Sequence, residues 1–410
     1  MPKLLLLLIV ALFFFTGCEE EPPVLPGLKF SSITVVSNPP GAVVFFNNKS
    51  TGKVTPTVIE NLEPGFYKID LKLDKYIDTT LYTLVARNQQ DTMKLEMMEN
   101  PSDWWVNWNS SNSPLPLNVI NDIALDAFDN KWLGTNGKGL VKFDGQTWTA
   151  FDRSNSGIPD NYILDVYIEK NNRIWVATTE GFGRFENGVW TVYNRNNSNL
   201  PDNYITSIDI DLLGNVWLST YSSGVVKFDG VTFKIYNTGN SGLPVNRVNC
   251  VKTDQNGSVL IGTHGGGIAV YTPSTDGWII HNSVTSNIPN EFVNKIVIDQ
   301  KNEIWVGYLP SSGMSGISSF NRKFFTHFSA FNSGFTGTII TGVAVSTTGN
   351  VWVSTADAGI FHYTTGKWIK YNTANSGIKD NVALSIAIDR DGNKWVGAGG
   401  LNRYIGGKGF

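Results

Sequence analysis

The sequence predicts an all-β protein made of repeated units, and three observations support this prediction. A ten-residue element at residues 126–135 recurs towards the C-terminus at intervals of about 42 to 47 residues. Aromatic residues make up 12% of the chain, charged residues 16%, and 41 residues are glycine, which is typical of turn-rich β-structure. The copies centre on Trp132, Trp175, Trp217, Leu260, Trp305, Trp352 and Trp395. A repeat of this length indicates a propeller, a solenoid or an array.

Each repeat contains four strand signals. In the second copy, residues 162–168 alternate as a first strand, and residues 173–178 form a second. The third and fourth strands are expected at residues 183–186 and 189–193. Residues 197–203 then connect to the next repeat. Four short antiparallel strands in a repeat of this length are the blade of a β-propeller.

The repeats predict a ring that is closed by the N-terminal strand. The last repeat has three strand signals, at residues 382–389, 394–398 and 401–405. Residues 105–118 copy the fourth strand and connection of the first repeat, residues 148–161. We therefore expect residues 105–108 to complete a seventh blade, which leaves no open sheet edge. The expected fold is a seven-bladed β-propeller over residues 103–410.

A smaller unit is expected over residues 32–98. Its turn signals are Pro39-Pro-Gly-Ala42, the hairpin at residues 47–52, Thr55-Pro56 and Pro64-Gly before Tyr67. These residues resemble the PEGA domain, a small β-sandwich of bacterial envelope proteins, with Pro-Pro-Gly-Ala in place of the usual Pro-Glu-Gly-Ala. The resemblance implies a β-sandwich that acts as a spacer or adhesive module, and it brings no catalytic residue.

The first 18 residues are expected to be a lipoprotein signal peptide. After Lys3, residues 4–15 are an unbroken apolar run, too short to span a bilayer comfortably but suited to a signal peptide. The run ends in Phe15-Thr-Gly-Cys18, which resembles the bacterial lipobox and implies a lipid-modified Cys18. An ordinary cleaved signal is the alternative, although ordinary sites favour Ala-x-Ala-like residues.

Residues 19–31 are expected to be an acidic, proline-rich tether. Glu19, Glu20 and Glu21 follow the lipobox, and prolines keep such a segment extended. The acidic cluster is similar to a surface-export signal of Bacteroidetes-type lipoproteins, and a simple soluble tether is the alternative. The other cysteine, Cys250, lies among apolar residues and is expected to be a buried, inert thiol.

The propeller repeats resemble the two-component regulator propeller family. Asp211-Leu-Leu-Gly-Asn-Val-Trp217 and Asp389-Arg-Asp-Gly-Asn-Lys-Trp395 carry the resemblance, which covers about three quarters of the chain. It implies ligand recognition on one propeller face, with glycans as the leading class. No kinase segment or second propeller accompanies these repeats, so we expect no histidine-kinase activity.

The repeated residues predict structure more than chemistry. The tryptophans are expected to pack between blades. The acidic residues six positions before them are expected to accept hydrogen bonds from turn N–H groups; they are Asp126, Glu169, Asp211, Asp254, Asp299 and Asp389. The four histidines show no metal-ligand or triad spacing. No metal site, cofactor or catalytic constellation is predicted.

A candidate ligand face is expected where the loops around the channel mouth meet. The loop between the second and third strands of the fifth blade is enlarged by residues 309–315, and such insertions often map to a binding face. Aromatic and amide side chains around a concavity suit sugar or peptide binding. The candidate residues are Tyr162, Tyr204, Tyr221, Arg247, His264, Phe292 and Tyr308.

The sequence therefore predicts a non-enzymatic, lipid-anchored cell-envelope protein that binds glycan or peptidoglycan. The formal charge of −3 and the absence of a basic stripe argue against nucleic acid. One alternative is a polysaccharide lyase that uses Tyr204, Arg247 and His264. Another is a subunit of an envelope protein complex, for which an exposed apolar patch on the propeller rim would be the sign.

Overall fold

The computed structural model describes residues 30–74, 76, 78–97, 104–311, 314–364 and 366–405. The chain divides into two compact units, residues 1–99 and 100–410. The regular structure of the described residues is β-strand, and they contain no helix long and apolar enough to cross a membrane. The predicted signal peptide, Cys18 and almost all of the tether lie outside the described residues.

The N-terminal unit consists of two sheets, with strand orders β4-β1-β7 and β3-β2-β5-β6. Its strands are β1 (Ser31–Asn38), β2 (Val43–Phe46), β3 (Lys49–Val54), β4 (Thr57–Leu62), β5 (Gly65–Lys72), β6 (Thr79–Val85) and β7 (Gln90–Glu96). Alternate residues of β1 are buried, as expected for a strand with one face on a core. Ile33 of β1, Val44 of β2 and Ile69 of β5 belong to one buried cluster, so both sheets contribute to the same core.

Seven four-stranded sheets are found in the described part of the second unit. The first three contain β9 (Ile120–Leu125), β10 (Lys131–Thr135), β11 (Leu140–Phe143) and β12 (Trp148–Phe151); β13 (Ile163–Ile168), β14 (Ile174–Thr178), β15 (Gly181–Glu186) and β16 (Val189–Tyr193); and β17 (Ile205–Ile210), β18 (Val216–Thr220), β19 (Val225–Phe228) and β20 (Phe233–Tyr236). The next three contain β21 (Val248–Thr253), β22 (Val259–Thr263), β23 (Ile268–Thr272) and β24 (Gly277–His281); β25 (Val293–Ile298), β26 (Ile304–Tyr308), β27 (Ile317–Phe320) and β28 (Phe325–Phe328); and β29 (Ile340–Val345), β30 (Val351–Thr355), β31 (Gly359–Thr364) and β32 (Lys367–Tyr371). The last sheet contains β33 (Ser385–Ile388), β34 (Lys394–Gly397), β35 (Leu401–Tyr404) and β8 (Trp105–Trp108).

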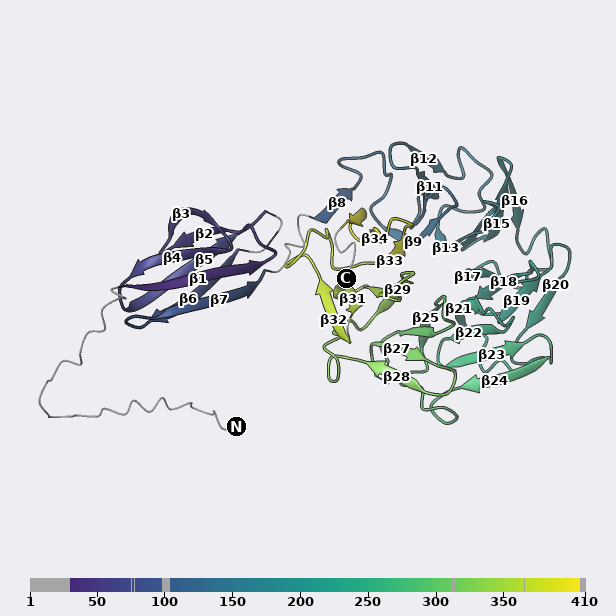
Figure 1. Ribbon diagram of the computed structural model, residues 1–410. Helices are drawn as coiled ribbons and strands as arrows, with labels where there is room; N and C mark the ends of the chain where they lie inside the picture. The colour runs from purple at the N-terminus through teal and green to yellow at the C-terminus, as the bar shows by residue number, and fades with distance from the viewer. Residues whose placement is uncertain are drawn as a thin grey trace, which may run out of the picture. The chain divides into compact units, whose positions relative to one another are not determined.

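The sheets follow one another around a ring, with the first strand of each sheet towards the centre (Figure 1). The first strands of neighbouring sheets contact each other, and β33 of the last sheet contacts β9 of the first. The expected pairing of the N-terminal strand is confirmed, because β8 lies antiparallel to β35 with Trp108 opposite Leu401 and Trp105 opposite Tyr404. The ring is thus joined by two segments that are nearly 300 residues apart in sequence.

The core between the sheets is built on the repeated tryptophans, as predicted. Trp217 is fully buried and stacks on Tyr236, with 5.6 Å between the ring centroids. The expected role is confirmed for the aspartates: Asp211 accepts hydrogen bonds from the turn N–H groups of Leu213 and Asn215. Glu169 instead accepts from the side chains of Arg173 and Trp175. The Asp211 carboxylate also accepts a 2.9 Å bond from the indole N–H of Trp217, which the sequence did not reveal. The side chain of Asp211 therefore holds both the turn and the buried Trp217 in place.

Candidate functional site

A β-bulge in the first strand of six sheets supplies the residues that line the centre of the ring. In β9, Ile120 pairs with Thr135 and Asp122 with Gly134, so that Asn121 is the extra residue. Such a bulge redirects one side chain out of the regular alternation. The equivalent residues are Leu164, Thr206, Asn249, Asn294 and Thr341, and Leu384 occupies this place in the last sheet. All seven line one cavity of about 320 Å³.

Most of these residues also join one sheet to the next. The side-chain amide of Asn249 donates to the carbonyl of Val293 at 2.8 Å, and that of Asn294 donates to Ile340 at 2.6 Å. Asn121, Thr206 and Thr341 make the same bond to the following sheet. Because one donor of each is fixed on backbone, the rim of the cavity is a preorganised ring of amides and hydroxyls.

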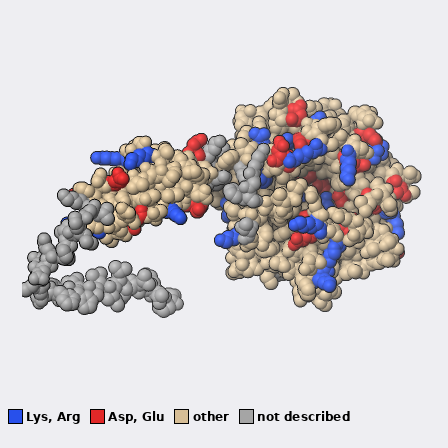
Figure 2. Space-filling model, viewed as in Figure 1, with Lys and Arg blue, Asp and Glu red and all other residues tan. Residues whose placement is uncertain are grey.

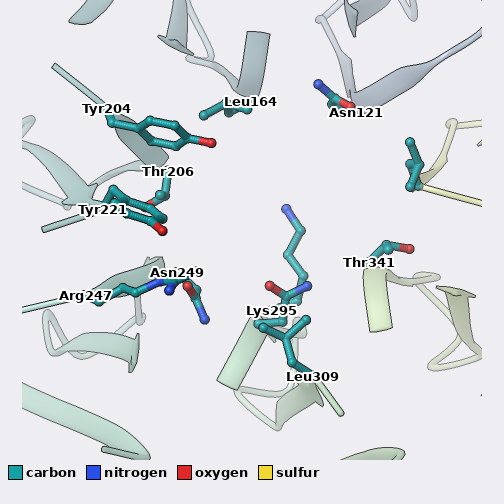
Figure 3. A pocket seen from close by; sticks show the side chains of 12 residues that line it. Asn121, Leu164, Tyr204, Thr206, Tyr221, Arg247, Asn249, Lys295, Leu309 and Thr341 are labelled. Carbon is teal, nitrogen blue, oxygen red and sulfur yellow. The ribbon is translucent and has the colours of Figure 1, made fainter. Parts of the chain in front are cut away.

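Two tyrosines and an arginine form one wall of the cavity. Figure 3 shows Tyr204 and Tyr221 on the same side as Leu164, with Arg247 next to Tyr221. The two tyrosine rings are 5.0 Å apart, and the Arg247 guanidinium lies 4.4 Å from the Tyr221 ring centroid. Tyr204 and Tyr221 are 38% and 42% exposed, so part of each side chain is accessible to a ligand.

Lys295 of β25 extends towards the middle of the cavity (Figure 3). Its ammonium is 4.0 Å from the Asp165 carboxylate of β13, and Lys252 of β21 lies 3.3 Å from Asp209 of β17. Burial, together with the charge of Asp165, raises the pKa of Asp122 to about 6. Burial opposes ionisation of Asp165 too, but Lys295 and Lys252 outweigh it and lower the pKa of this carboxyl.

The structure brings three of the seven predicted ligand residues to this cavity: Tyr204, Tyr221 and Arg247. His264 and Phe292 lie beside it, paired through their backbones and with their rings 5.0 Å apart. The pKa of His264 is lowered by burial and by Arg247, which favours a neutral imidazole. Tyr162 is half exposed and pairs with Asn136, outside the cavity lining.

The prediction that Tyr308 belongs to the ligand face is wrong. Tyr308 is the last residue of β26, not a loop residue, and its side chain is fully buried. Its hydroxyl donates to the Ser318 hydroxyl at 3.1 Å, and burial raises its pKa. It occupies the place that a buried threonine such as Thr263 holds in five of the other sheets. A tyrosine there fills core volume and cannot contact a ligand.

The bulge residues and Lys295 were missed from the sequence. Their common signal is position: each bulge residue directly follows the buried apolar residue that opens the first strand, as Asn249 follows Val248 and Asn294 follows Val293. Lys295 comes one residue later. The predicted fifth-blade insertion does contribute to the cavity, through Leu309.

Two further features are the grouping of possible metal ligands and the distribution of charge on the face in Figure 2. Within the described residues, no three His, Cys, Asp or Glu side chains are grouped so that they could hold a metal ion. Acidic and basic side chains are interspersed on the face shown in Figure 2, without a basic stripe. The cavity offers aromatic faces, amides, hydroxyls and two cations, and such groups bind polar organic ligands.

Two family models match the chain. Residues 30–100 match the PEGA domain, and residues 157–180 match the two component regulator propeller. Both resemblances seen in the sequence are thus confirmed. No curated protein matches the sequence.

Several solved structures are similar in fold to about three quarters of this chain. One is the extracellular domain assigned to the hybrid two component system BT3049 from B. thetaiotaomicron, with a TM-score of 0.62 and 23% identity over 73% of this chain and 41% of that chain. A second is virginiamycin B lyase from Staphylococcus aureus, with a TM-score of 0.58 and 12% identity over 73% of this chain and 98% of that chain. A third is YCF48 bound to D1 peptide, with a TM-score of 0.55 and 14% identity over 74% and 97%. This chain spans less than half of the first structure's length, and identities this low establish a shared fold alone.

Proposed function

We propose that this chain is an exported, lipid-anchored binding protein of the bacterial cell envelope. In this proposal the N-terminal unit is a β-sandwich spacer, and the seven sheets are the blades of a closed propeller whose channel mouth binds a glycan. The match to the PEGA domain and the apolar leader ending in Cys18 support the envelope location. The match to the two component regulator propeller supports a recognition role.

The observation that carries the proposal is the composition of the cavity at the channel mouth. Tyr204 and Tyr221 are both partly exposed and line the cavity, and because Arg247 covers Tyr221, Tyr204 is the ring on which the C–H face of a sugar can stack. Asn249, Asn294 and Thr341 line the same cavity and supply amides and a hydroxyl that match sugar hydroxyl groups. Because these polar side chains are already anchored on neighbouring sheets, binding orders few groups.

A protein partner is the second candidate, and a separate apolar cavity of about 550 Å³ favours it. Pro289, Met314, Phe331 and Phe335 help to line this cavity, and Phe331 is fully exposed. In most of the other connections between sheets, the residue that corresponds to Phe331 is small or polar, such as Ser154, Asn196 or Gly239. An apolar side chain from a partner would bury this surface.

The test is a binding screen of the chain without residues 1–18. Thermal shift and isothermal titration against envelope, peptidoglycan and dietary oligosaccharides should identify a sugar that raises the melting temperature. Tyr204→Ala should then abolish the shift, whereas Tyr162→Ala, a tyrosine outside the cavity, should leave it intact. Mass spectrometry of the bound sugar separates the alternatives. An unchanged sugar supports recognition, a cleaved one supports the lyase with Tyr204, Arg247 and His264, and no binding at all favours the protein partner.

A further inference from the structure

We propose that the channel mouth takes an anionic sugar residue, whose carboxylate or sulfate group lies between Arg247 and Lys295. This inference rests on the proposed glycan function and specifies the class of glycan. Three observations carry it: the charges that line the cavity, the partners of its two cations, and the position of Lys295 in the ring.

The cavity lining carries positive charge alone. Of the described residues that line it, Arg247 and Lys295 are the charged ones, and none is Asp or Glu. Carboxylates close to the rim are engaged by the protein. Asp202 accepts hydrogen bonds from the backbone and hydroxyl of Ser222, at 3.0 and 2.7 Å. The Asp165 carboxylate contacts Lys295 but is not part of the lining, so the charges that line the mouth are the two cations.

Neither cation is neutralised by a tight ion pair. Within the described residues Arg247 forms no salt bridge, and its guanidinium rests on the face of Tyr221. The buried Nε of Arg247 has no hydrogen-bond partner. The contact of Lys295 with Asp165 is 4.0 Å long, and the lysine side chain remains 28% exposed to the cavity. Both cations are therefore available to an anionic ligand at close range.

The position of Lys295 is unusual within the ring. The equivalent residue is Asp122, Asp165, Ser207, Cys250, Gly342 or Ser385 in the other six sheets. Small or short side chains are enough for packing at this place. Lys295 serves as a counter-charge to Asp165, but its long side chain also remains 28% exposed and lines the cavity, where a ligand can contact it.

The geometry also gives the sugar an orientation. Tyr204 and Tyr221 lie on one side of the cavity and Lys295 extends into its middle, with Arg247 beside Tyr221 (Figure 3). A sugar ring stacked on Tyr204 would direct its anionic substituent towards the two cations. The side-chain amides of Asn249 and Asn294 would contact the hydroxyl groups of the same sugar residue.

The test compares three probes of equal length by isothermal titration: trigalacturonate, the neutral α-1,4-linked galactotriose, and a 6-sulfated galactotriose. At least one anionic probe should bind at least about tenfold more tightly than the neutral one, since a charged hydrogen bond is worth about a factor of ten or more. The tighter anionic probe identifies the group as carboxylate or sulfate. Its affinity should also fall as salt rises from 50 to 200 mM.

Lys295→Met should lower the affinity for the anionic probe by about tenfold and leave that for galactotriose unchanged. Lys295→Arg should preserve the affinity for the anionic probe. Lys138→Met is the control for loss of a lysine charge, because Lys138 is exposed, lies between β10 and β11 and is outside the cavity. Should Lys295→Met fail to fold, Arg247→Gln and the salt dependence of the wild type decide in its place.

Equal affinity for the neutral and anionic probes would overturn this inference while leaving the glycan function standing. An affinity for the anionic probe that Lys295→Met and Arg247→Gln leave unchanged would overturn it as well. Failure of every sugar to bind would instead refute the proposed function itself.

Discussion

Arg322 places a guanidinium nitrogen 2.9 Å from the carboxylate of Asp254, whose side chain is fully buried in the preceding sheet. In four other sheets, the carboxylate at this position receives the indole N–H of the central tryptophan, as Asp126 does from Trp132. Leu260 replaces that tryptophan here. Arg322 of the next sheet therefore takes the place of the missing indole as the partner of the Asp254 carboxylate. A contact between sheets thus compensates for the replacement of tryptophan by Leu260.

Arg322→Met should destabilise the protein, because it leaves a buried carboxylate without a counter-charge. Breaking a buried ion pair by removing one partner costs about 3 to 5 kcal/mol, and partial exposure of Arg322 places the expected loss near the lower value. Equilibrium denaturation gives the free energy of unfolding. The double variant with Asp254→Asn should lose less than the sum of the two single changes. Strict additivity would mean that the two residues do not interact.

Closure of the ring by β8 can be tested by truncation. A chain of residues 104–410 retains β8, whereas one of residues 109–410 lacks it and leaves β35 as an open edge. The shorter chain also loses Trp108, which stacks 5.6 Å from Trp395. Loss of Trp105 and Trp108 removes about 5 kcal/mol or more of apolar burial. We expect the shorter chain to melt much lower or to aggregate, and equal melting temperatures would contradict closure.

The sequence predicted the strands and the closure because the pattern repeats. Asp211 and Trp217 stand six residues apart, as do Asp389 and Trp395, and this fixed spacing marks a turn followed by a buried strand. Strand β4 of the N-terminal unit is harder to recognise in the sequence, because Glu60 and Asn61 interrupt its alternation and Asn61 has a positive φ. Where the period is regular, sequence alone defines the element.

The site was less predictable, because it depends on register. That Asn249 is the extra residue of a bulge follows from the pairing of Val248 with Thr263 and of Cys250 with Gly262, which one strand alone cannot reveal. Tyr308 was misread as a loop residue because its environment depends on Ser318, a small buried residue of the adjacent strand. The direction of a side chain at the end of a strand thus depends on how that strand pairs with its neighbours in the sheet.

Lipidation of Cys18 gives a direct test of the envelope proposal. In a bacterial host fed an alkyne-labelled fatty acid, the wild-type chain should carry the label and sediment with membranes. Cys18→Ser should lose both properties, because the thiol that accepts the lipid is gone. Cys250→Ser is the matched control, since Cys250 is buried in the propeller and should not affect labelling. A labelled Cys18→Ser protein would exclude this anchor.

Asp122 and Asp165 occupy equivalent positions in neighbouring sheets but have opposite pKa shifts. Each accepts a backbone hydrogen bond, from Val166 at 3.0 Å and Ile208 at 2.8 Å. Burial and Asp165 raise the pKa of Asp122 to about 6, against the opposing effects of Lys295 and Lys252. Because the folded protein binds this proton more tightly than the unfolded chain, the contribution of Asp122 to stability is present below pH 4 and is lost as the pH rises through 6.

Asp122→Asn should therefore stabilise the protein at pH 7.5 by about 1 to 3 kcal/mol and have little effect at pH 4. The asparagine oxygen can still accept the Val166 N–H. Asp165→Asn is the matched comparison and should act in the opposite direction. Lys295 and Lys252 lower the pKa of Asp165, so its charge stabilises the fold at neutral pH, and that stabilisation is lost as the pH falls. Denaturant unfolding at pH 4, 5.5 and 7.5 measures both variants. If both changes shifted the free energy of unfolding in the same direction at pH 7.5, the opposite pKa shifts of the two carboxyl groups would be contradicted.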